Sequence, residues 1–466
     1  MSDPSLLSAV EAARAMAAGK LSPVDLLDAY LARIDRHEAA LNVFIALDRD
    51  AARTAARAAE AELRAGRRRG PLHGLPIGIK DIVDVAGLRT TCHSRLRLDA
   101  PPTIEDAVCV AALRGAGGLV VGKLATHEFA IGGPSFDLPF PPARNPWNRD
   151  HHPGGSSSGS GAGLAAGFFP LAVGTDTGGS VRNPASACGI VGLKPTYGLV
   201  SRRGVQPLSF TLDHVGPMAR TVADCALMLQ VMAAHDPADP GSAPAPRVDY
   251  ARSLESGVRG LRIGVVRHFH DADHVAHPGV AAALDEVVRT LAAEGAQVAD
   301  IRLPPLARFA TVNRVILMAE AFAIHGNDLR ERPEGFCQSS RRRMLVGAFV
   351  GGADYVQANR QRLELMVAVD AALAEVDVLL CASSMDPPCR IDDAGEVERT
   401  YPRQARTPFN VTGHPALAMM SGLSRDGLPL SVQFAGRNFD EATVLRVARA
   451  WERASGIDRK RPALAA

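Results

Sequence analysis

The chain lacks the charge imbalance and the cysteine spacing that are typical of several classes of protein. Its 52 lysines and arginines nearly match its 50 aspartates and glutamates, which leaves a formal net charge of +2. This balance gives no general attraction to nucleic acid or anionic membranes, and it favours small, nearly neutral ligands. The seven cysteines are an odd number and include no CxxC pair. We therefore expect reduced, mostly buried thiols rather than a disulfide framework or a zinc site.

Long apolar runs and targeting segments are missing as well. The first residues, 1–5, have neither the basic start nor the apolar core of a secretory signal, and no stretch approaches the length of a membrane-spanning helix. The sequence contains no internal repeat. With 47% hydrophobic and 22% charged residues, it has the composition of a globular protein with a large core. We expect a cytoplasmic protein that does not contact a membrane.

Two glycine-rich segments come close to nucleotide-binding motifs but do not complete them. The segment 117–124 resembles a phosphate-binding P-loop, yet Leu124 follows the lysine where that motif needs Ser or Thr to hold magnesium. The glycines of a second segment have the wrong spacing for a dinucleotide-binding turn: Gly159, Gly161 and Gly163. No cluster of side chains suits a metal or an organic cofactor. We therefore predict an activity that needs no metal and no cofactor.

The most informative segments are two turns in which serine follows glycine. Gly178 and Gly179 stand directly before Ser180. Paired glycines let the backbone approach a substrate closely and direct its N–H groups at one point, which is how an oxyanion hole is built. The second segment, 154–163, contains Ser156 and consists of Gly, Ser and Ala alone. This composition predicts neither a strand nor an ordinary helix start.

A flexible linker is the ordinary interpretation of such a Gly/Ser run. This run, however, is followed at once by the apolar segment 164–173, which predicts a buried helix and strand. A third segment, 74–81, ends a short apolar stretch with Lys80, whose charge is costly to bury unless it is neutralised or hydrogen-bonded. Taken together, Lys80, Ser156 and Ser180 favour a serine hydrolase that needs no histidine.

These segments resemble the amidase signature family, whose hallmark is a Ser–cis-Ser–Lys triad inside a long Gly/Ser-rich segment. The similarity extends over 74–220 and continues more weakly around 408–416. It implies that Ser180 is the acylated nucleophile, that Ser156 is a bridging serine held by a cis peptide bond, and that Lys80 is the base. A lysine accepts a serine proton only if burial or its neighbours lower its pKa far below about 10.4.

The resemblance also implies which residues surround the triad. An oxyanion hole holds the developing alkoxide through backbone N–H groups. The residues expected to form this hole and to bind substrate are Ala130, Thr177, Gly178 and Gly179.

Other polar residues of these segments have supporting roles in our interpretation. Asp176 and Arg182 flank the nucleophile closely enough to pair and brace its loop. An arginine at this place could instead bind a substrate carboxylate through two hydrogen bonds, but we favour bracing. The other serines of the Gly/Ser run could support the proton relay or satisfy backbone groups, and we favour the second role for Ser157, Ser158 and Ser160.

Beyond these motifs, short β-like runs alternate with helices, which predicts an α/β fold with a largely parallel or mixed sheet. The expected strands lie at 77–79, 119–121, 171–173, 261–266, 297–299, 376–381 and 430–434. By resemblance, this is the amidase signature fold, a large mixed β-sheet core flanked by helices on both sides. We expect a single amidase domain over 1–466. It would comprise a helical N-terminal wrap over 1–70, the signature core over 71–236, and a C-terminal lobe over 247–466 that completes the sheet and the substrate pocket.

The predicted function is an amidase that hydrolyses the C–N bond of a small carboxylic amide through an acyl-enzyme on Ser180, with carbamate, ureido and ester substrates left open. The alternative is the A-type subunit of a glutamine-dependent tRNA amidotransferase, which shares every motif and would need partner chains. A catalytically inactive binding module is disfavoured, because all three triad residues are present. The expected partner is a small-molecule amide without direct nucleic-acid contact, and a homodimer is among the assemblies left open.

Overall fold

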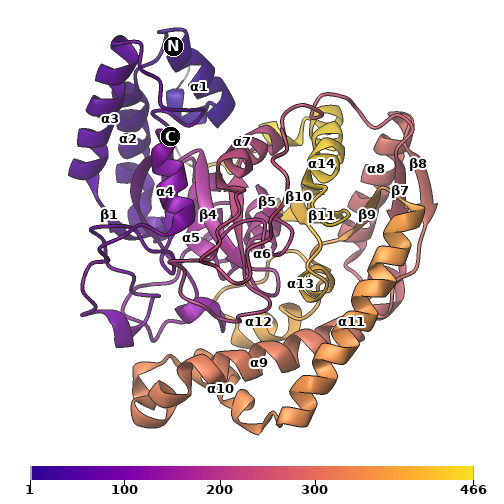
Figure 1. Cartoon of the computed structure of the whole chain (residues 1–466). Helices are drawn as coiled ribbons and strands as arrows, with labels where there is room; N and C mark the ends of the chain where they lie inside the picture. Colours follow the sequence, from indigo (N-terminus) through magenta and orange to yellow (C-terminus); the bar gives the residue numbers. More distant parts are fainter. Residues whose placement is uncertain (1–2, 465–466) are drawn as a thin grey trace.

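The computed structural model describes residues 3–464, and one mixed sheet of eleven strands forms the core of this part of the chain (Figure 1). The strand order is β1-β3-β2-β4-β6-β5-β10-β11-β9-β7-β8. Parallel pairs join β2 to β3 and β4, and β7 to β8 and β9, whereas the other neighbours are antiparallel. This architecture confirms the predicted mixed sheet. The strands are β1 (Phe44–Leu47), β2 (Pro76–Lys80), β3 (Leu119–Leu124), β4 (Leu171–Asp176), β5 (Val191–Lys194), β6 (His214–Ala219), β7 (Arg262–Val265), β8 (Gln297–Asp300), β9 (Val378–Ala382), β10 (Ala416–Leu423) and β11 (Pro429–Ala435).

Helices cover both faces of this sheet, as predicted. Leu171 and Val173 of β4 pack into one apolar cluster with α1, α4, α7 and α14, whereas Ala172 between them packs into a second cluster with α3, α5 and α6. Successive side chains of a strand point to opposite faces, so both faces of β4 are buried. The helices are α1 (Ala9–Ala17), α2 (Pro23–Leu41), α3 (Arg49–Arg64), α4 (Val108–Gly115), α5 (Ser158–Ala166), α6 (Arg182–Cys188), α7 (Val222–Met232), α8 (Pro278–Ala293), α9 (Leu306–Glu331), α10 (Gln338–Leu345), α11 (Gly352–Glu375), α12 (Ala394–Thr400), α13 (Thr407–Val411) and α14 (Glu441–Ser455).

The N-terminal region is helical as expected, with one exception. β1 lies inside the predicted helical wrap and forms the edge of the sheet by pairing antiparallel to β3. A strand of four residues is too short to show a periodic pattern, which explains why the sequence did not reveal it. No helix within residues 3–464 combines the length and the apolar composition needed to cross a membrane.

The Gly/Ser run forms part of a buried helix, which corrects our expectation that its composition excludes an ordinary helix start. α5 begins at Ser158, and all its residues are buried. A Cβ atom on Gly159 would lie 2.6 Å from the Val43 carbonyl oxygen, and one on Gly163 would lie 2.3 Å from the Phe169 ring. Small residues are therefore needed here because the helix backbone packs directly against its neighbours.

The two halves of the chain share the sheet. Strands from 44–219 meet strands from 262–435 where β5 pairs antiparallel with β10. The long helices α9 and α11 of the second half, drawn in orange in Figure 1, contact each other. The sequence had not revealed these two helices. The division of the domain into three stretches stays a prediction, although the shared sheet supports a single unit.

Candidate active site

Lys80 is fully buried at the end of β2 and contacts two hydroxyl groups. Its Nζ donates to Ser156 Oγ at 2.7 Å and to Thr175 Oγ1 at 2.7 Å. Burial lowers the pKa of Lys80 to about 7, although the carboxylates of Asp176 and Asp213 act in the opposite direction. A large share of the Lys80 side chains is therefore neutral near pH 7 and able to accept a proton. The sequence analysis had missed Thr175.

Ser156 is anchored through its own carbonyl group. The peptide bond between Gly155 and Ser156 is cis, as the resemblance implied. The Ser156 carbonyl accepts the N–H of His127 at 3.0 Å and the N–H of Ser158 at 2.8 Å. A side chain at position 155 would clash with His127, because a Cβ atom there would lie 2.1 Å from the His127 ring. With its backbone held in this way, Ser156 directs its hydroxyl toward Lys80 Nζ.

Ser180 lies in a tight loop between β4 and α6. Gly179 before it has φ +128°, a value that side chains rarely allow, which explains the need for glycine. The carbonyl of Ser180 accepts the N–H of Ser157 at 3.3 Å, so the loop is joined to the segment that holds Ser156. The structure thus brings the three predicted triad segments together.

Asp176 organises this loop through its carboxylate. Its Oδ1 accepts the N–H of Gly179 at 2.7 Å, and its Oδ2 accepts the N–H of Val181 at 3.1 Å. Burial alone would raise the pKa of Asp176, but Arg182 lowers it, so the carboxylate stays ionised. Because the Gly179 N–H is engaged by Asp176, other N–H groups of the loop must supply the main donors of an oxyanion hole.

Arg182 braces the loop with every donor that it has. Its Nε donates to Asp176 Oδ2 at 3.0 Å, and its Nη2 donates to Asp176 Oδ1 and to Asn410 Oδ1. Its Nη1 donates to the Arg406 carbonyl at 2.9 Å and to Gln433 Oε1 at 3.0 Å. A guanidinium group has five N–H donors, and all five have partners here. This geometry favours bracing over the binding of a substrate carboxylate by Arg182.

The remaining predicted residues line the space beside the loop. Ala130 and the preceding Phe129 both adopt left-handed backbone angles, which cost energy for residues with a side chain. Ala130, Thr175 and Thr177 line a cavity of about 420 Å³. Thr175 separates this cavity from Lys80, because it lines the cavity and its hydroxyl contacts Lys80 Nζ. The Thr177 hydroxyl donates to Asp213 Oδ1 at 2.6 Å, a second contact that the sequence had not indicated.

Asn313 of α9 also contacts the loop. Its Nδ2 donates to the Thr177 carbonyl at 3.2 Å, and a Cβ atom on Gly178 would lie 3.4 Å from its Oδ1. An oxyanion hole needs its donors fixed before the reaction begins, and Asn313 restricts the loop in this way. No local pattern in the sequence marks Asn313, because its partners lie more than a hundred residues away.

The other serines of the Gly/Ser run satisfy backbone groups, which confirms the role that we favoured. Ser157 Oγ donates to the Thr175 carbonyl, Ser158 Oγ to the Ala125 carbonyl and Ser160 Oγ to the Val173 carbonyl. Within residues 3–464, no group of three or more His, Cys, Asp and Glu side chains is arranged to hold a metal ion. Six of the seven cysteines are buried and all seven are free thiols, as expected.

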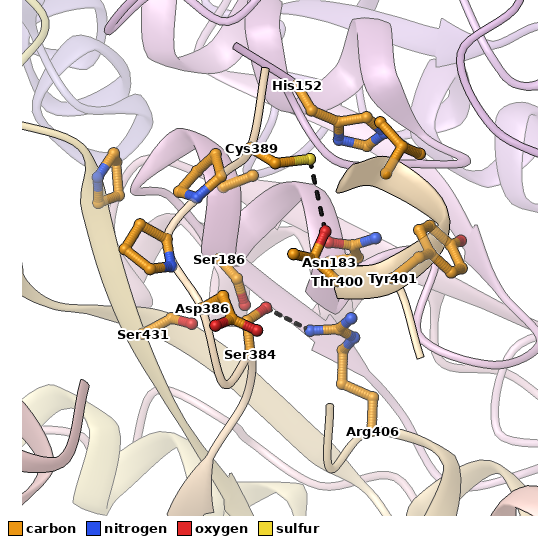
Figure 2. Close-up of a pocket in the computed structure, with 15 residues that line it drawn as sticks. His152, Asn183, Ser186, Ser384, Asp386, Cys389, Thr400, Tyr401, Arg406 and Ser431 are labelled. Atoms are coloured by element: carbon orange, nitrogen blue, oxygen red, sulfur yellow. Dashed lines mark hydrogen bonds between the residues drawn. The ribbon is translucent and has the colours of Figure 1, made fainter. Parts of the chain in front are cut away.

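A second, smaller cavity of about 50 Å³ lies beside α6 (Figure 2). It is lined by residues from four separate parts of the chain, which the sequence had not connected: His152, Asn183, Ser186, Ala187, Ser384, Asp386, Pro387, Pro388, Cys389, Val397, Thr400, Tyr401, Arg406, Pro429 and Ser431. Figure 2 shows the Arg406 guanidinium group hydrogen-bonded to Ser384, with His152 at the other end of the view.

Comparison with known proteins identifies the family. The family model described as Amidase matches residues 25–445. The A-type subunit of a glutamyl-tRNA(Gln) amidotransferase from Roseiflexus castenholzii is 39% identical, over 98% of this chain and 97% of that protein. An amidase from Pseudomonas putida is 40% identical, over 100% of this chain and 99% of that protein. A solved structure of "an unexpected vestigial protein complex" that concerns "an s-triazine catabolic enzyme" has a TM-score of 0.91 and 32% identity, covering 98% of this chain and 100% of that one. The chain therefore belongs to the amidase signature family, whose members hydrolyse the C–N bond of amides.

Proposed function

We propose that this chain hydrolyses a small carboxylic amide through an acyl-enzyme on Ser180. The observation that carries the proposal is the buried Lys80, whose Nζ lies 2.7 Å from Ser156 Oγ. Burial lowers the pKa of Lys80 to about 7, so the amine is available as a base without a histidine. The cavity beside Ala130 and Thr177 offers room for the substrate next to this relay.

The reaction follows from the order of these groups. Ser180 Oγ attacks the amide carbon while its proton passes to Ser156 and the Ser156 proton passes to neutral Lys80. The carbonyl oxygen becomes an alkoxide, held by the N–H groups of Thr177, Gly178 and Ser180. When the C–N bond breaks, the proton returns from Lys80 through Ser156 to the leaving nitrogen. Water then attacks the ester, and the same relay frees the acid.

The second candidate is the A-type subunit of a glutamine-dependent tRNA amidotransferase. The relative from Roseiflexus castenholzii is named as such a subunit, at 39% identity over nearly the whole chain. A protein of this kind needs a docking surface for other chains, and Val356, Leu363 and Val367 expose their apolar side chains along α11. Their spacing of seven and four residues puts them on one face of the helix. In this function any contact with tRNA would depend on partner chains.

A substrate panel separates the two functions. We expect the isolated chain to release ammonia or an amine from at least one short aliphatic, aryl or ureido amide, because the whole relay lies in one chain. Ammonia release is measured for each amide and for glutamine, with Ser180→Ala as the blank. If the chain hydrolyses glutamine alone, and only with copurified partner chains present, the amidotransferase function is correct and the first proposal is wrong.

The activity should rise with pH through the pKa of Lys80. Burial lowers this pKa to about 7, and only the neutral amine accepts the serine proton. Below about pH 7 the protonated fraction grows, so kcat/KM is expected to fall by about tenfold for each further pH unit. A pH profile of kcat/KM for a neutral amide measures this limb, because it reports groups of the free enzyme. A profile that is flat between pH 5 and 8 would show that Lys80 is not the base.

A further inference from the structure

The small cavity of Figure 2 contains a cation with incomplete partners. Arg406 is buried, and its Nη1 donates to the Ser383 carbonyl at 3.0 Å and to Ser384 Oγ at 2.6 Å. Its Nε is also buried but has no hydrogen-bond partner. Within residues 3–464, no carboxylate forms an ion pair with this guanidinium group, unlike that of Arg182. A buried charge with neutral partners alone is costly, so Arg406 is suited to an anionic ligand.

The charged groups around the cavity do not compensate for Arg406. Asp386 lies on the cavity wall, but its Oδ2 is engaged by Arg403 Nε at 2.6 Å. The side chain of Arg343 stacks over the ring of Tyr401, another lining residue, at 5.4 Å and adds positive charge. Burial lowers the pKa of His152 to about 4, so this ring is neutral at pH 7. Asp176 and Arg182 also lie near Arg406, but they are paired with each other, so the net charge around the cavity is positive.

Arg406 also lies against the loop that carries Ser180. A Cβ atom on Gly179 would be 2.6 Å from Arg406 Nε, and Gly179 is the residue before Ser180. Asn183, less than one helical turn beyond Ser180, lines the same cavity. A volume of about 50 Å³ has room for a few water-sized groups, and a carboxylate is a group of this size.

We infer that Arg406 determines specificity by binding a carboxylate carried by the substrate, so that the preferred substrates are monoamides of short dicarboxylic acids. Guanidinium and carboxylate groups form charge-assisted, often paired hydrogen bonds, which a neutral acyl group cannot replace. The inference rests on the proposed amide hydrolysis and adds the chemical class of the substrate. Glutamine, an amide that carries a carboxylate, fits the same requirement, so the inference holds for both candidate functions.

The first test compares two substrates of similar size. Succinamate carries the carboxylate, and butyramide carries a methyl group at that end. We expect the wild-type chain to prefer succinamate, and Arg406→Gln to lower the ratio of the two kcat/KM values roughly 10- to 100-fold. Arg406→Lys should retain part of the preference. Arg390→Gln is the matched control, because Arg390 comes from the same part of the chain but is exposed, is paired with Asp392 and does not line the cavity, and it should leave the ratio unchanged.

The possible results separate this inference from the proposed function. If butyramide is hydrolysed as well as succinamate, or if Arg406→Gln keeps the wild-type ratio, the role of Arg406 is wrong and the amidase function remains. If no amide is hydrolysed, the proposed function fails. Should the Arg406 variants not fold, binding to the wild-type chain decides the point. Succinate should then raise the melting temperature more than neutral succinamide does, and equal shifts would overturn the inference.

Discussion

Replacing Ser180 by alanine is expected to abolish amide hydrolysis while leaving the fold intact. Asp176 and Arg182 hold the loop through hydrogen bonds that do not involve the Ser180 hydroxyl. Removing this hydroxyl therefore leaves these hydrogen bonds in place. Loss of the nucleophile lowers kcat by roughly 10⁶-fold in a serine protease, and we expect a loss approaching this size here. Single-turnover and steady-state assays on the purified variant measure the loss, and a circular dichroism melt checks the fold.

Covalent labelling provides an independent check of the same assignment. A fluorophosphonate or a sulfonyl fluoride should modify Ser180 in the wild-type chain, and mass spectrometry of the digested protein identifies the labelled peptide. Ser160→Ala is a suitable control, because the Ser160 hydroxyl donates to the Val173 carbonyl and has no place in the relay. Modification of another residue, with Ser180 unlabelled, would refute the assignment of the nucleophile.

Lys80→Met and Ser156→Ala should each lower kcat by about 10⁴-fold or more, and the double variant should be no slower than the worse single variant. The two side chains contact each other at 2.7 Å and act as one path for the proton, so removing either interrupts the whole path. Methionine replaces lysine with a side chain of similar length and carries no charge. The measurement is kcat for the three variants with the same amide.

Thr175→Val is the matched control for this pair. Thr175 Oγ1 accepts the other hydrogen bond of Lys80, but the hydroxyl lies outside the path from Ser180. The loss for this variant should be smaller than that for Ser156→Ala. Losses for Lys80 and Ser156 that multiply in the double variant would contradict a single relay and would indicate two separate roles.

The triad segments could be predicted because their signal is local. Gly178 and Gly179 adjoin Ser180, and the Gly/Ser run that contains Ser156 is continuous. Neighbouring residues in the sequence therefore indicate that the backbone packs closely at these places. The resemblance then related the separate segments to one site. The strands β2, β3, β4, β7, β9 and β11 were found for a similar reason, since each contains a short run of apolar residues. β8, with only Val298 and Ala299 as apolar residues, was found as well.

Other parts of the site and the fold have no local signal. Asn410 and Gln433 bind Arg182 across 228 and 251 residues of chain, and nothing near them indicates that contact. The buried face of α9 includes polar residues such as Asn313 and Glu320, so the apolar stripe that predicts a helix is interrupted. Glu320 accepts hydrogen bonds from Thr211 and Tyr355, which only the folded chain brings near.

The hydrogen bonds of Arg182 make the two halves of the chain dependent on each other. The triad residues all lie between Lys80 and Ser180, yet the brace that positions the nucleophile ends on α13 and β11, in the last quarter of the chain. A fragment that ended before α13 would contain every reactive group and lack the supports that orient them. We therefore expect that substitutions in the C-terminal half can impair catalysis without touching the reactive groups.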